Sequence, residues 1–571
     1  MQSTKFLAVE VLLAPLLKRV RYNSVILFFV SLGIVAFGQP ARIGWLGALS
    51  GSFGFALFFI AIPRHASKKQ RFWWATVWFS LIQSIQLSWM STIEFQGYYI
   101  LWVYCFLCIG IGLQFGLFTL FIPSEGKLSK LNITSGAALW MLIEYARLYF
   151  ICGFSWNPIG LALTHFIASL QFASVGGVFG LSFWIMLTNL SALNAWRQRQ
   201  DIAVWLFLVA IPYLFGIFVL SFHWPSVANK GSIQAALIQT DLLPSQKIPY
   251  PGRKLDYVSP FIQWQRIIRG LKGQLLQKWD FVALPEAALP LQSDGMVYPF
   301  SAVRELMSRE MGSEIEEKFP PFSYPFAEKR KVGEVWVLFV SNLFWCQTLA
   351  NHFNVEWVVG LDYTDKEQCK NFNSAFCLKP QKVQMERYDK RVLLPLAEYL
   401  PYNFLRSLSK SYGINDFFFP GKETKVCGEK ILFSPSICYE ETFPRIMREG
   451  ARKGAQLFVN VTNDNYFPNS ILHEQHLYHA RLRAVENGIP LIRACNSGVS
   501  AAVDCFGRII ARKDVSLNVE DCVLNCSVSS YTLPTLYSFW GDQCILSCSL
   551  VAQLLFWMRW VRKRQNNNAL V

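Results

Sequence analysis

Three side chains of this sequence have the types needed for nucleophilic catalysis on a carbonyl. Cys438 ends a strand-like run over 431–437, and a cysteine thiolate is a strong nucleophile. Glu286 follows a second such run, and a partly buried carboxylate there can act as a general base. Lys390 lies in a charged loop, where an ammonium near a thiol lowers the thiol pKa and stabilises an oxyanion. Each residue alone is more often structural, so the hypothesis rests on all three.

The sequence around Cys438 adds two features to this hypothesis. Glu440 and Glu441 follow it almost at once, and the backbone N–H of Tyr439 is placed to be a second oxyanion donor. Cys427 is the main competing nucleophile, but no strand leads into it and no turn follows it. Cys438 is therefore the predicted nucleophile.

The composition indicates a membrane protein with an additional globular part. Of 571 residues, 53% are hydrophobic and only 16% are charged, and the apolar excess falls before about residue 222 and near the C-terminus. The formal charge of +16 would fit nucleic-acid binding. Much of the basic charge, however, lies in short connections between apolar runs, where it orients a chain in a membrane. We expect no nucleic-acid partner.

Eight apolar runs approach the roughly 20 residues that a helix needs to cross a bilayer. They are 24–38, 43–62, 72–91, 98–122, 134–153, 172–195, 202–222 and 541–558. An earlier run, 6–17, would fit an interfacial helix. Lys and Arg cluster in alternate connections, so the positive-inside rule places both ends of the chain in the cytoplasm and the middle outside.

The region between the seventh and eighth spans reads as a layered α/β domain. Short apolar runs alternate there with amphipathic stretches over 262–278 and 473–487. The strand candidates are 233–239, 281–285, 355–361, 373–378, 430–437, 456–461, 491–494 and 499–504. Residues 301–345 are more charged and contain several prolines, which predicts an insertion or lid. The predicted domains are 1–222 with seven spans, 223–530 outside the membrane, and 531–571 with the last span and a basic tail.

Three weaker signals remain open at this stage. His473, His476 and His479 recur every third residue, which fits a packed helix better than a zinc site, and we predict no metal. Glu144 and Arg147 form an i, i+3 pair within an apolar run, where a functional role and mutual neutralisation are equally good readings. In an oxidising exterior two cysteine pairs could form disulfides, although no spacing proves it; they are Cys369/Cys377 and Cys522/Cys526.

Together, these motifs resemble the Glu–Lys–Cys triad of the nitrilase, or carbon–nitrogen hydrolase, superfamily. With the apolar runs included, nearly the whole chain resembles the bacterial apolipoprotein N-acyltransferase family. The matching stretches are Leu284-Pro-Glu-Ala-Ala-Leu-Pro290, Arg387-Tyr-Asp-Lys390, Glu398-Tyr-Leu-Pro401, Cys438-Tyr-Glu440, Thr462-Asn-Asp-Asn465, Ala480-Arg-Leu-Arg-Ala484, Asn496-Ser-Gly498 and Ala138-Leu-Trp-Met-Leu-Ile-Glu-Tyr-Ala-Arg147. The sequence departs from the family's pattern at Asn463-Asp-Asn-Tyr-Phe-Pro468 and Lys247-Ile-Pro-Tyr250, both expected near the lipid entrance.

The resemblance implies an αββα sandwich beside the membrane spans, with the following roles. Glu286 would be the base, Lys390 the oxyanion stabiliser and Cys438 the nucleophile. Glu398 would support the triad, while Tyr439 and Glu440 would shape the acyl pocket.

The resemblance also implies a ping-pong reaction without a cofactor. Cys438 would take an acyl chain from a phospholipid as a thioester, and the α-amine of a diacylglyceryl-cysteine apolipoprotein would then accept it. The protein would act as a monomer in the bacterial inner membrane, with its catalytic domain on the periplasmic side.

Two other functions remain open from the residues. A membrane-tethered amidase would use the same triad with water as the acceptor, although the full-length architecture argues against it. A transporter or scaffold would only bind through its outer domain. Against this reading, the apolar runs carry few ionisable residues and show no internal repeat of the kind transporters often have.

Overall fold

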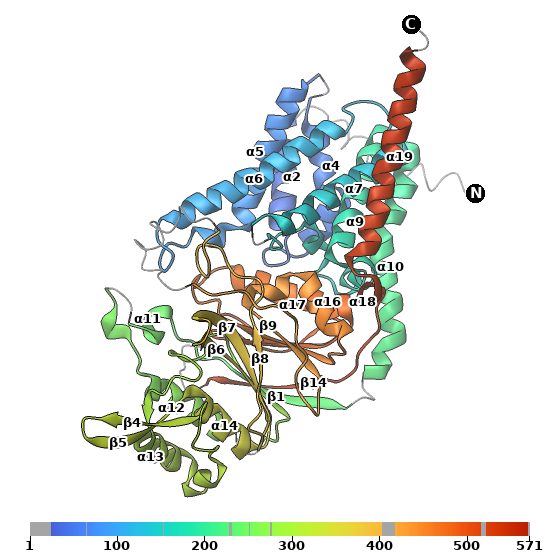
Figure 1. Ribbon diagram of the computed structural model, residues 1–571. Helices are drawn as coiled ribbons and strands as arrows, with labels where there is room; N and C mark the ends of the chain where they lie inside the picture. Colours follow the sequence, from blue (N-terminus) through green and yellow to red (C-terminus); the bar gives the residue numbers. More distant parts are fainter. Residues whose placement is uncertain are drawn as a thin grey trace.

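The computed structural model describes residues 24–63, 65–151, 153–227, 231–249, 252–274, 277–401, 417–515 and 521–568. The apolar run 6–17 and Tyr250 therefore lie outside the described residues. Figure 1 shows a helical region at one end, a region of packed sheets at the other, and two long helices, α10 and α19, beside the helical bundle.

The helical region consists of apolar helices that coincide with the predicted runs. Its main helices are α2 (Ser24–Phe37), α4 (Phe55–Ala61), α5 (Lys68–Gln86), α6 (Tyr99–Phe121), α7 (Lys130–Ala146), α9 (Ala173–Arg197), α10 (Ile202–Val227) and, from the end of the chain, α19 (Asp542–Asn568). Among the described residues, four helices are long and apolar enough to cross a membrane: α6, α9, α10 and α19. The other predicted runs form helices that are shorter or less apolar, so the expected eight spans reduce here to about four candidates.

The described part of the outer domain has two large sheets. One has the strand order β14-β1-β2-β6-β7-β8 and the other has the order β13-β12-β11-β10-β9. The first sheet contains β1 (Ser232–Ile238), β2 (Phe281–Leu284), β6 (Glu356–Asp365), β7 (Lys370–Leu378), β8 (Glu386–Asp389) and β14 (Val523–Ser529). The second contains β9 (Phe433–Ile437), β10 (Leu457–Thr462), β11 (Leu491–Cys495), β12 (Ser500–Val503) and β13 (Ile509–Lys513). All eight predicted strands are present, which confirms the predicted α/β class.

The alternation of side chains along the strands produces a four-layer arrangement. On β2, Phe281 and Ala283 face the cluster shared with the second sheet, whereas Val282 and Leu284 face helices α12 (Pro260–Lys272) and α14 (Asn342–Phe353). The opposite face of the second sheet packs on α16 (Pro444–Arg452) and α17 (Leu472–Asn487). The layers therefore run helix, sheet, sheet, helix, as an αββα sandwich requires.

The candidate catalytic residues follow the carboxyl ends of parallel strands. Strands β1, β2 and β6 run parallel, as do β9, β10 and β11. Glu286 comes just after β2, and Cys438 comes directly after β9. Loops at the carboxyl ends of neighbouring parallel strands meet at one edge, which is where open α/β sheets place their sites.

Residues 301–345, predicted as an insertion or lid, form a unit beside the first sheet. It contains most of α13 (Phe300–Met311) and the strands β4 (Ala327–Val332) and β5 (Val335–Val340), which form a small sheet with β3 (Tyr298–Pro299) from just before the range. Helix α14 begins within this range, and its Trp345 stacks on Trp264 in the buried core. The end of the range therefore belongs to the domain's own core layer.

The helical region rests on the α16–α17 layer of the sandwich (Figure 1). Helix α17 packs against α9, and the Glu486 carboxylate accepts a hydrogen bond from the Val178 backbone N–H at 2.7 Å. Helix α9 is kinked at Gly177, where φ is +64° and a Cβ would meet the Tyr537 ring. The packing of α17 on α9 therefore joins the layer that covers the second sheet to the helical region.

The two cysteine pairs left open by the sequence are not bonded in this structure. Cys369, Cys377, Cys522 and Cys526 are all free thiols.

Candidate active site

A buried cluster of charges lies at the edge of the first sheet. The Lys390 ammonium contacts Glu286 Oε1 at 3.0 Å and Glu398 Oε1 at 2.7 Å. The Asn373 amide, on β7, donates to the same two oxygens at 2.7 and 3.1 Å. Glu398 is held in turn by the Leu394 backbone N–H, which donates to its Oε2 at 2.8 Å. Two carboxylates from different loops therefore share one lysine and one amide.

The two carboxylates keep Lys390 charged. Burial alone lowers the pKa of this lysine, but Glu286 and Glu398 together raise its pKa well above the ordinary value. The Lys390 side chain is only 1% exposed, so little water screens its charge. An ammonium in such a place interacts strongly with a negative charge that develops beside it.

Cys438 lies on a tight turn that opens the short helix η9 (Cys438–Thr442). Its φ is +52°, a left-handed conformation that side chains other than glycine rarely adopt and that recurs at active sites. The Asn460 amide on β10 donates to the Cys438 carbonyl at 3.2 Å. The turn thus presents the thiol away from β9 while its backbone is held from below.

Cys438, the predicted nucleophile, is buried. Burial raises the pKa of Cys438, and Glu286 raises it further, whereas Lys390 acts in the opposite direction. The sequence reasoning considered only the lysine, but burial outweighs it. Glu286 and Lys390 are in direct contact, and the Glu440 carboxylate bonds both to the Arg391 N–H next to Lys390 and to the Ile437 N–H next to Cys438. The structure therefore places the three predicted triad residues in the same region.

Glu440, two residues after Cys438, is fully buried and links the segment around Cys438 to the segment around Lys390. Its Oε1 accepts from the backbone N–H groups of Arg391 and Val392 at 2.5 and 3.2 Å. Its Oε2 accepts from the Tyr388 hydroxyl and the Ile437 N–H, both at 2.8 Å. These bonds join the loop that carries Lys390 to strand β9, and the acyl-pocket role that the resemblance implied for Glu440 stays a prediction.

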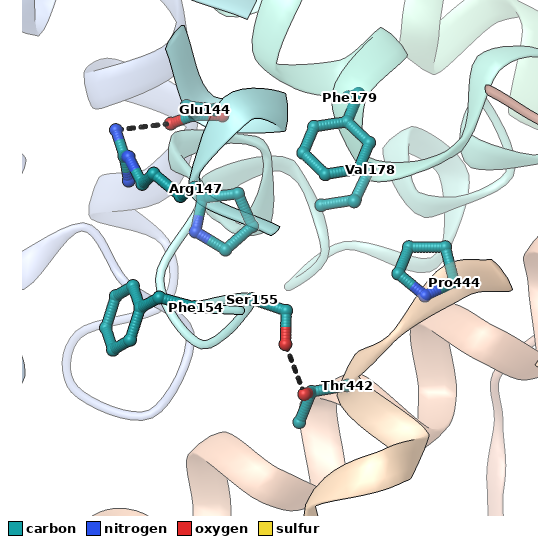
Figure 2. A pocket seen from close by; sticks show the side chains of 9 residues that line it. Glu144, Arg147, Phe154, Ser155, Val178, Phe179, Thr442 and Pro444 are labelled. Carbon is teal, nitrogen blue, oxygen red and sulfur yellow. Dashed lines mark hydrogen bonds and ion pairs between the residues drawn. The ribbon is translucent and has the colours of Figure 1, made fainter. Parts of the chain in front are cut away.

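Tyr439 reaches in the other direction, to the helical region. Its hydroxyl donates to the Gly153 carbonyl at 3.2 Å and accepts from the Ser155 N–H at 3.3 Å. The Ser155 and Thr442 hydroxyls also form a hydrogen bond, at a small cavity that both regions line (Figure 2).

On the far side of that cavity Glu144 pairs with Arg147 and accepts a hydrogen bond from the Ile159 N–H at 2.9 Å. The Glu144–Arg147 pair therefore supports the loop that docks on the nucleophile turn.

The next residue of this loop, Trp156, makes a second set of contacts with the outer domain. Its ring stacks on Tyr439 with centroids 6.0 Å apart, and its indole N–H donates to Gln475 on α17 at 2.7 Å. His479 donates through Nε2 to the Trp156 carbonyl at 2.8 Å. Of the three histidines with helical spacing, His479 thus serves this junction, and no metal-binding group is found among the described residues.

Sequence reasoning missed two further groups near Glu286. The Lys247 ammonium donates to the Ala287 carbonyl at 2.6 Å, and burial lowers its pKa to about 7 against the opposing effect of Glu286. Burial together with Glu286 and Glu398 raises the pKa of Asp362 to about 7. In the sequence, Lys247 was noted only as part of the stretch 247–250 that departs from the family's pattern. No nearby sequence feature marks Asp362 or Asn373 as part of a site.

These groups suit acyl transfer through a covalent intermediate. A thiol beside a carboxylate can lose its proton as it attacks a carbonyl, and a charged lysine beside it can stabilise the oxyanion.

Comparisons with known proteins find related sequences along most of the chain. The profile described as "Carbon-nitrogen hydrolase" matches residues 234–518, and "Apolipoprotein N-acyltransferase N-terminal domain" matches residues 33–191. The apolipoprotein N-acyltransferase of Chlamydia caviae is 28% identical over 545 residues, covering 92% of this chain and 95% of the relative. That of Geobacter metallireducens is 28% identical over 434 residues, covering 73% of each chain. Among solved structures, Saccharomyces cerevisiae Nit3, a nitrilase superfamily member, aligns with a TM-score of 0.34 and 18% identity, covering 52% of this chain and 90% of Nit3.

Proposed function

Because this chain belongs to the apolipoprotein N-acyltransferase family of the nitrilase superfamily, we propose that it moves one phospholipid acyl chain to an apolipoprotein through a Cys438 thioester. The acceptor is the N-terminal α-amine of a diacylglyceryl-cysteine. The observation that carries this proposal is the buried Lys390 ammonium, held between Glu286 and Glu398 within electrostatic reach of the Cys438 thiol.

In the first half-reaction, Cys438 Sγ attacks the ester carbonyl of the phospholipid. Glu286 accepts the thiol proton, and the oxyanion forms beside Lys390 and the Tyr439 backbone N–H. The ester C–O bond then breaks, and Glu286 returns the proton to the leaving glycerol oxygen. The products are a lysophospholipid and the acyl-enzyme.

In the second half-reaction, the neutral α-amine attacks the thioester carbonyl. Glu286 accepts a proton from the amine nitrogen, the C–S bond breaks, and the proton passes to the departing sulfur. An amide is formed and the thiol is restored. Glu398, together with Glu286, raises the pKa of Lys390 and so holds it protonated.

Two features support a site that works beside a lipid phase. The nucleophile turn contacts the helical region through Tyr439 and Thr442, and that region contains the helices long and apolar enough to cross a membrane. We place the protein in the bacterial inner membrane with its outer domain, about residues 223–530, on the periplasmic side. One chain supplies every group of the proposed site, and we propose that it acts as a monomer.

The test is transfer to a defined acceptor. The purified full chain is incubated with phospholipid that carries a labelled acyl chain and with a synthetic diacylglyceryl-cysteine lipopeptide. The proposal predicts label on the lipopeptide α-amine and a matching amount of lysophospholipid. Release of free fatty acid with no lipopeptide product would contradict it and indicate an amidase-like hydrolysis by water.

A further inference from the structure

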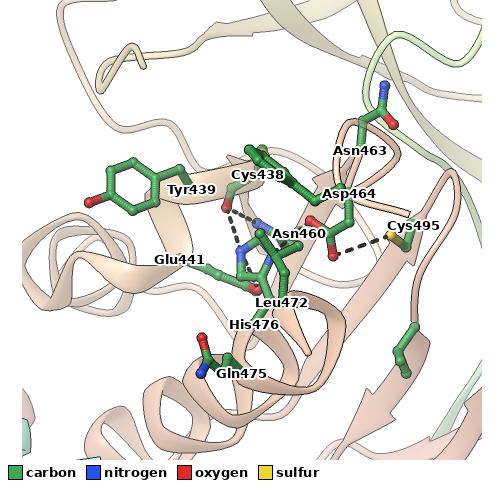
Figure 3. Close-up of polar contacts among 12 residues, drawn as sticks. Cys438, Tyr439, Glu441, Asn460, Asn463, Asp464, Leu472, Gln475, His476 and Cys495 are labelled. Atoms are coloured by element: carbon green, nitrogen blue, oxygen red, sulfur yellow. Dashed lines mark hydrogen bonds and ion pairs between the residues drawn. The ribbon is translucent and has the colours of Figure 1, made fainter. Parts of the chain in front are cut away.

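A second buried set of charged groups lies under the nucleophile turn, away from Lys390. Figure 3 shows His476, on α17, pointing from below toward the Cys438 backbone, with Glu441 and Asp464 around it. His476 Nε2 lies 3.3 Å from the Cys438 carbonyl and 3.0 Å from Glu441 Oε1, and its Nδ1 lies 2.9 Å from Asp464 Oδ1. The mechanism above assigns this histidine no role.

The neighbours of His476 make opposing demands on its ring nitrogens. The Cys438 carbonyl and the two carboxylates are all acceptors, so each ring nitrogen faces a group that needs a donor. The Arg493 guanidinium also contacts Nδ1, and because it is positively charged and can only donate, this contact opposes a proton there. The charge balance therefore has to decide between an imidazolium and a neutral ring.

That balance favours the imidazolium. The Arg493 guanidinium pairs with Glu441 at 3.0 Å and with Asp464 at 2.9 Å, and all three side chains are at most 3% exposed. One cation cannot neutralise two buried carboxylates, and an unpaired charge in such a place is costly. A proton on His476 makes the set neutral.

The neighbouring histidines do not supply this second positive charge in place of His476. His479 on the same helix is neutral, because burial and Arg483 lower its pKa well below the ordinary value. Burial also lowers the pKa of His473, although Asp464 opposes that effect. For His476 burial and Arg493 lower the pKa, but Asp464 and Glu441 raise it by more, so that the net shift is upward.

We propose that His476 is a positioning residue for the nucleophile: as an imidazolium it holds the Cys438 carbonyl and keeps the charge set under the turn neutral. Its support matters because Cys438 has an unfavourable φ, and among the described residues the Asn460 amide and the His476 ring are the side chains that contact its carbonyl. The proposal rests on the proposed function in one respect, since it takes Cys438 as the nucleophile.

The first experiment does not need a lipid substrate. Alkylation of Cys438 by iodoacetamide is followed by peptide mass spectrometry between pH 6 and pH 9 in the wild type, His476→Gln and His476→Leu. Glutamine can still donate to the carbonyl but carries no charge. We expect alkylation at pH 7 to slow by about tenfold in His476→Gln and further in His476→Leu. The difference should shrink as pH rises through the His476 pKa, because the wild type then loses its charge too.

The matched control is His352→Gln on α14, which lies in the outer layer away from the turn and should react like the wild type. Equal alkylation rates and parallel pH profiles in wild type and His476→Gln would overturn the proposal. With phospholipid as the acyl donor, kcat for acylation should fall in the same order while KM changes little. If the wild type forms no acyl adduct while the alkylation pattern holds, the proposed function fails and the positioning role stands.

A measurement on the unmodified protein covers the case in which the variants do not fold. Nitrogen-15 NMR of histidine-labelled protein in lipid should show one histidine with two ring protons at pH 7.5, as expected for an imidazolium stabilised by two carboxylates. If every histidine is neutral at that pH, the proposal is wrong.

Discussion

The two sheets of the outer domain contribute to the site in different ways. The first sheet supplies charge: Glu286 follows β2, Asn373 lies on β7 and Lys390 follows β8, and the Asn373 amide and the Lys390 ammonium both contact the Glu286 carboxylate. The second sheet supplies geometry, because its main contribution is Cys438 on a turn with φ of +52° whose backbone is held from several sides. In the proposed mechanism, most of the charged groups thus come from the first sheet, and the placement of Cys438 comes from the second.

The two halves also differ in what stabilises them. The charged half, which contains Glu286, Lys390 and Glu398, is stabilised by contacts within its own loops. One example is the hydrogen bond from the Leu394 N–H to Glu398. The nucleophile half rests on the helical region, through Tyr439 with Gly153 and through α17 with α9. A change in the first half should therefore act on chemistry, and a change in the second should act first on geometry and stability.

The largest expected effect is that of Lys390→Met in the charged half. It removes the oxyanion stabiliser and leaves Glu286 and Glu398 facing each other, so N-acylation of the lipopeptide should fall by about 10³-fold or more. The measurement is kcat with detergent-solubilised full chain whose folding is verified by size-exclusion chromatography. Lys382→Met, at an exposed lysine paired with Glu429, is the control and should be fully active. If the Lys390→Met variant kept a tenth of the wild-type rate, Lys390 would not be the main group that stabilises the oxyanion, and the role given to the first sheet would be wrong.

A smaller loss is expected for Glu398→Gln. The amide can still accept from the Leu394 N–H, but one of the two charges that hold Lys390 protonated is gone, so the rate should fall by roughly 10- to 100-fold. The same kcat assay measures it, with Glu386→Gln on β8 as the matched control. An unchanged rate would mean that Glu286 alone keeps Lys390 charged.

Tyr439→Phe probes the positioning half and should have a milder effect. It removes the hydroxyl that bridges Gly153 and Ser155, and a buried hydrogen bond contributes about 1 kcal/mol to stability. We expect a lower thermal midpoint and a several-fold slower acylation, with Tyr363→Phe as the control. If Tyr439→Phe abolished transfer as completely as Lys390→Met, the separation between the halves would not hold.

The smallest effect is a pH dependence of stability that comes from Lys247. Its pKa falls from the ordinary value to about 7 on folding, so between pH 7 and about pH 10 the unfolded chain binds more protons than the folded one. The free energy of unfolding should therefore rise with pH in that window, by at most about 1.4 kcal/mol per pH unit. Lys247→Met should lack this rise, as thermal midpoints at pH 7, 8 and 9 would show. Parallel curves for the two proteins would contradict the prediction.

The sequence predicted the parts of this site whose signal is local. An apolar run followed by a polar residue placed Glu286 and Cys438 at strand ends, and the structure has both there, after β2 and β9. The αββα layers were expected from the family resemblance, and the packing of the two sheets bears them out.

The missed parts depend on residues far apart in the chain. Gly153 and Tyr439 are separated by 286 positions, and nothing near either one indicates that they meet. The support from His476 required knowing that α17, β11 and the turn after β9 converge on one buried point. Helix spacing indicated only that the three histidines share a face. Among the described residues four helices are long and apolar enough to be candidate spans, because runs such as 72–91 and 134–153 form helices that are shorter or more polar, and the expected eight spans stay a prediction.

The most direct test of the central claim is the mass of the protein after reaction with phospholipid alone. We predict that intact-protein mass spectrometry shows one added acyl chain, that the adduct maps to the peptide carrying Cys438, and that neutral hydroxylamine removes it. Cys438→Ala should gain no mass under the same conditions. An acyl group on any other residue, or a folded wild-type protein that never gains one, would contradict the account.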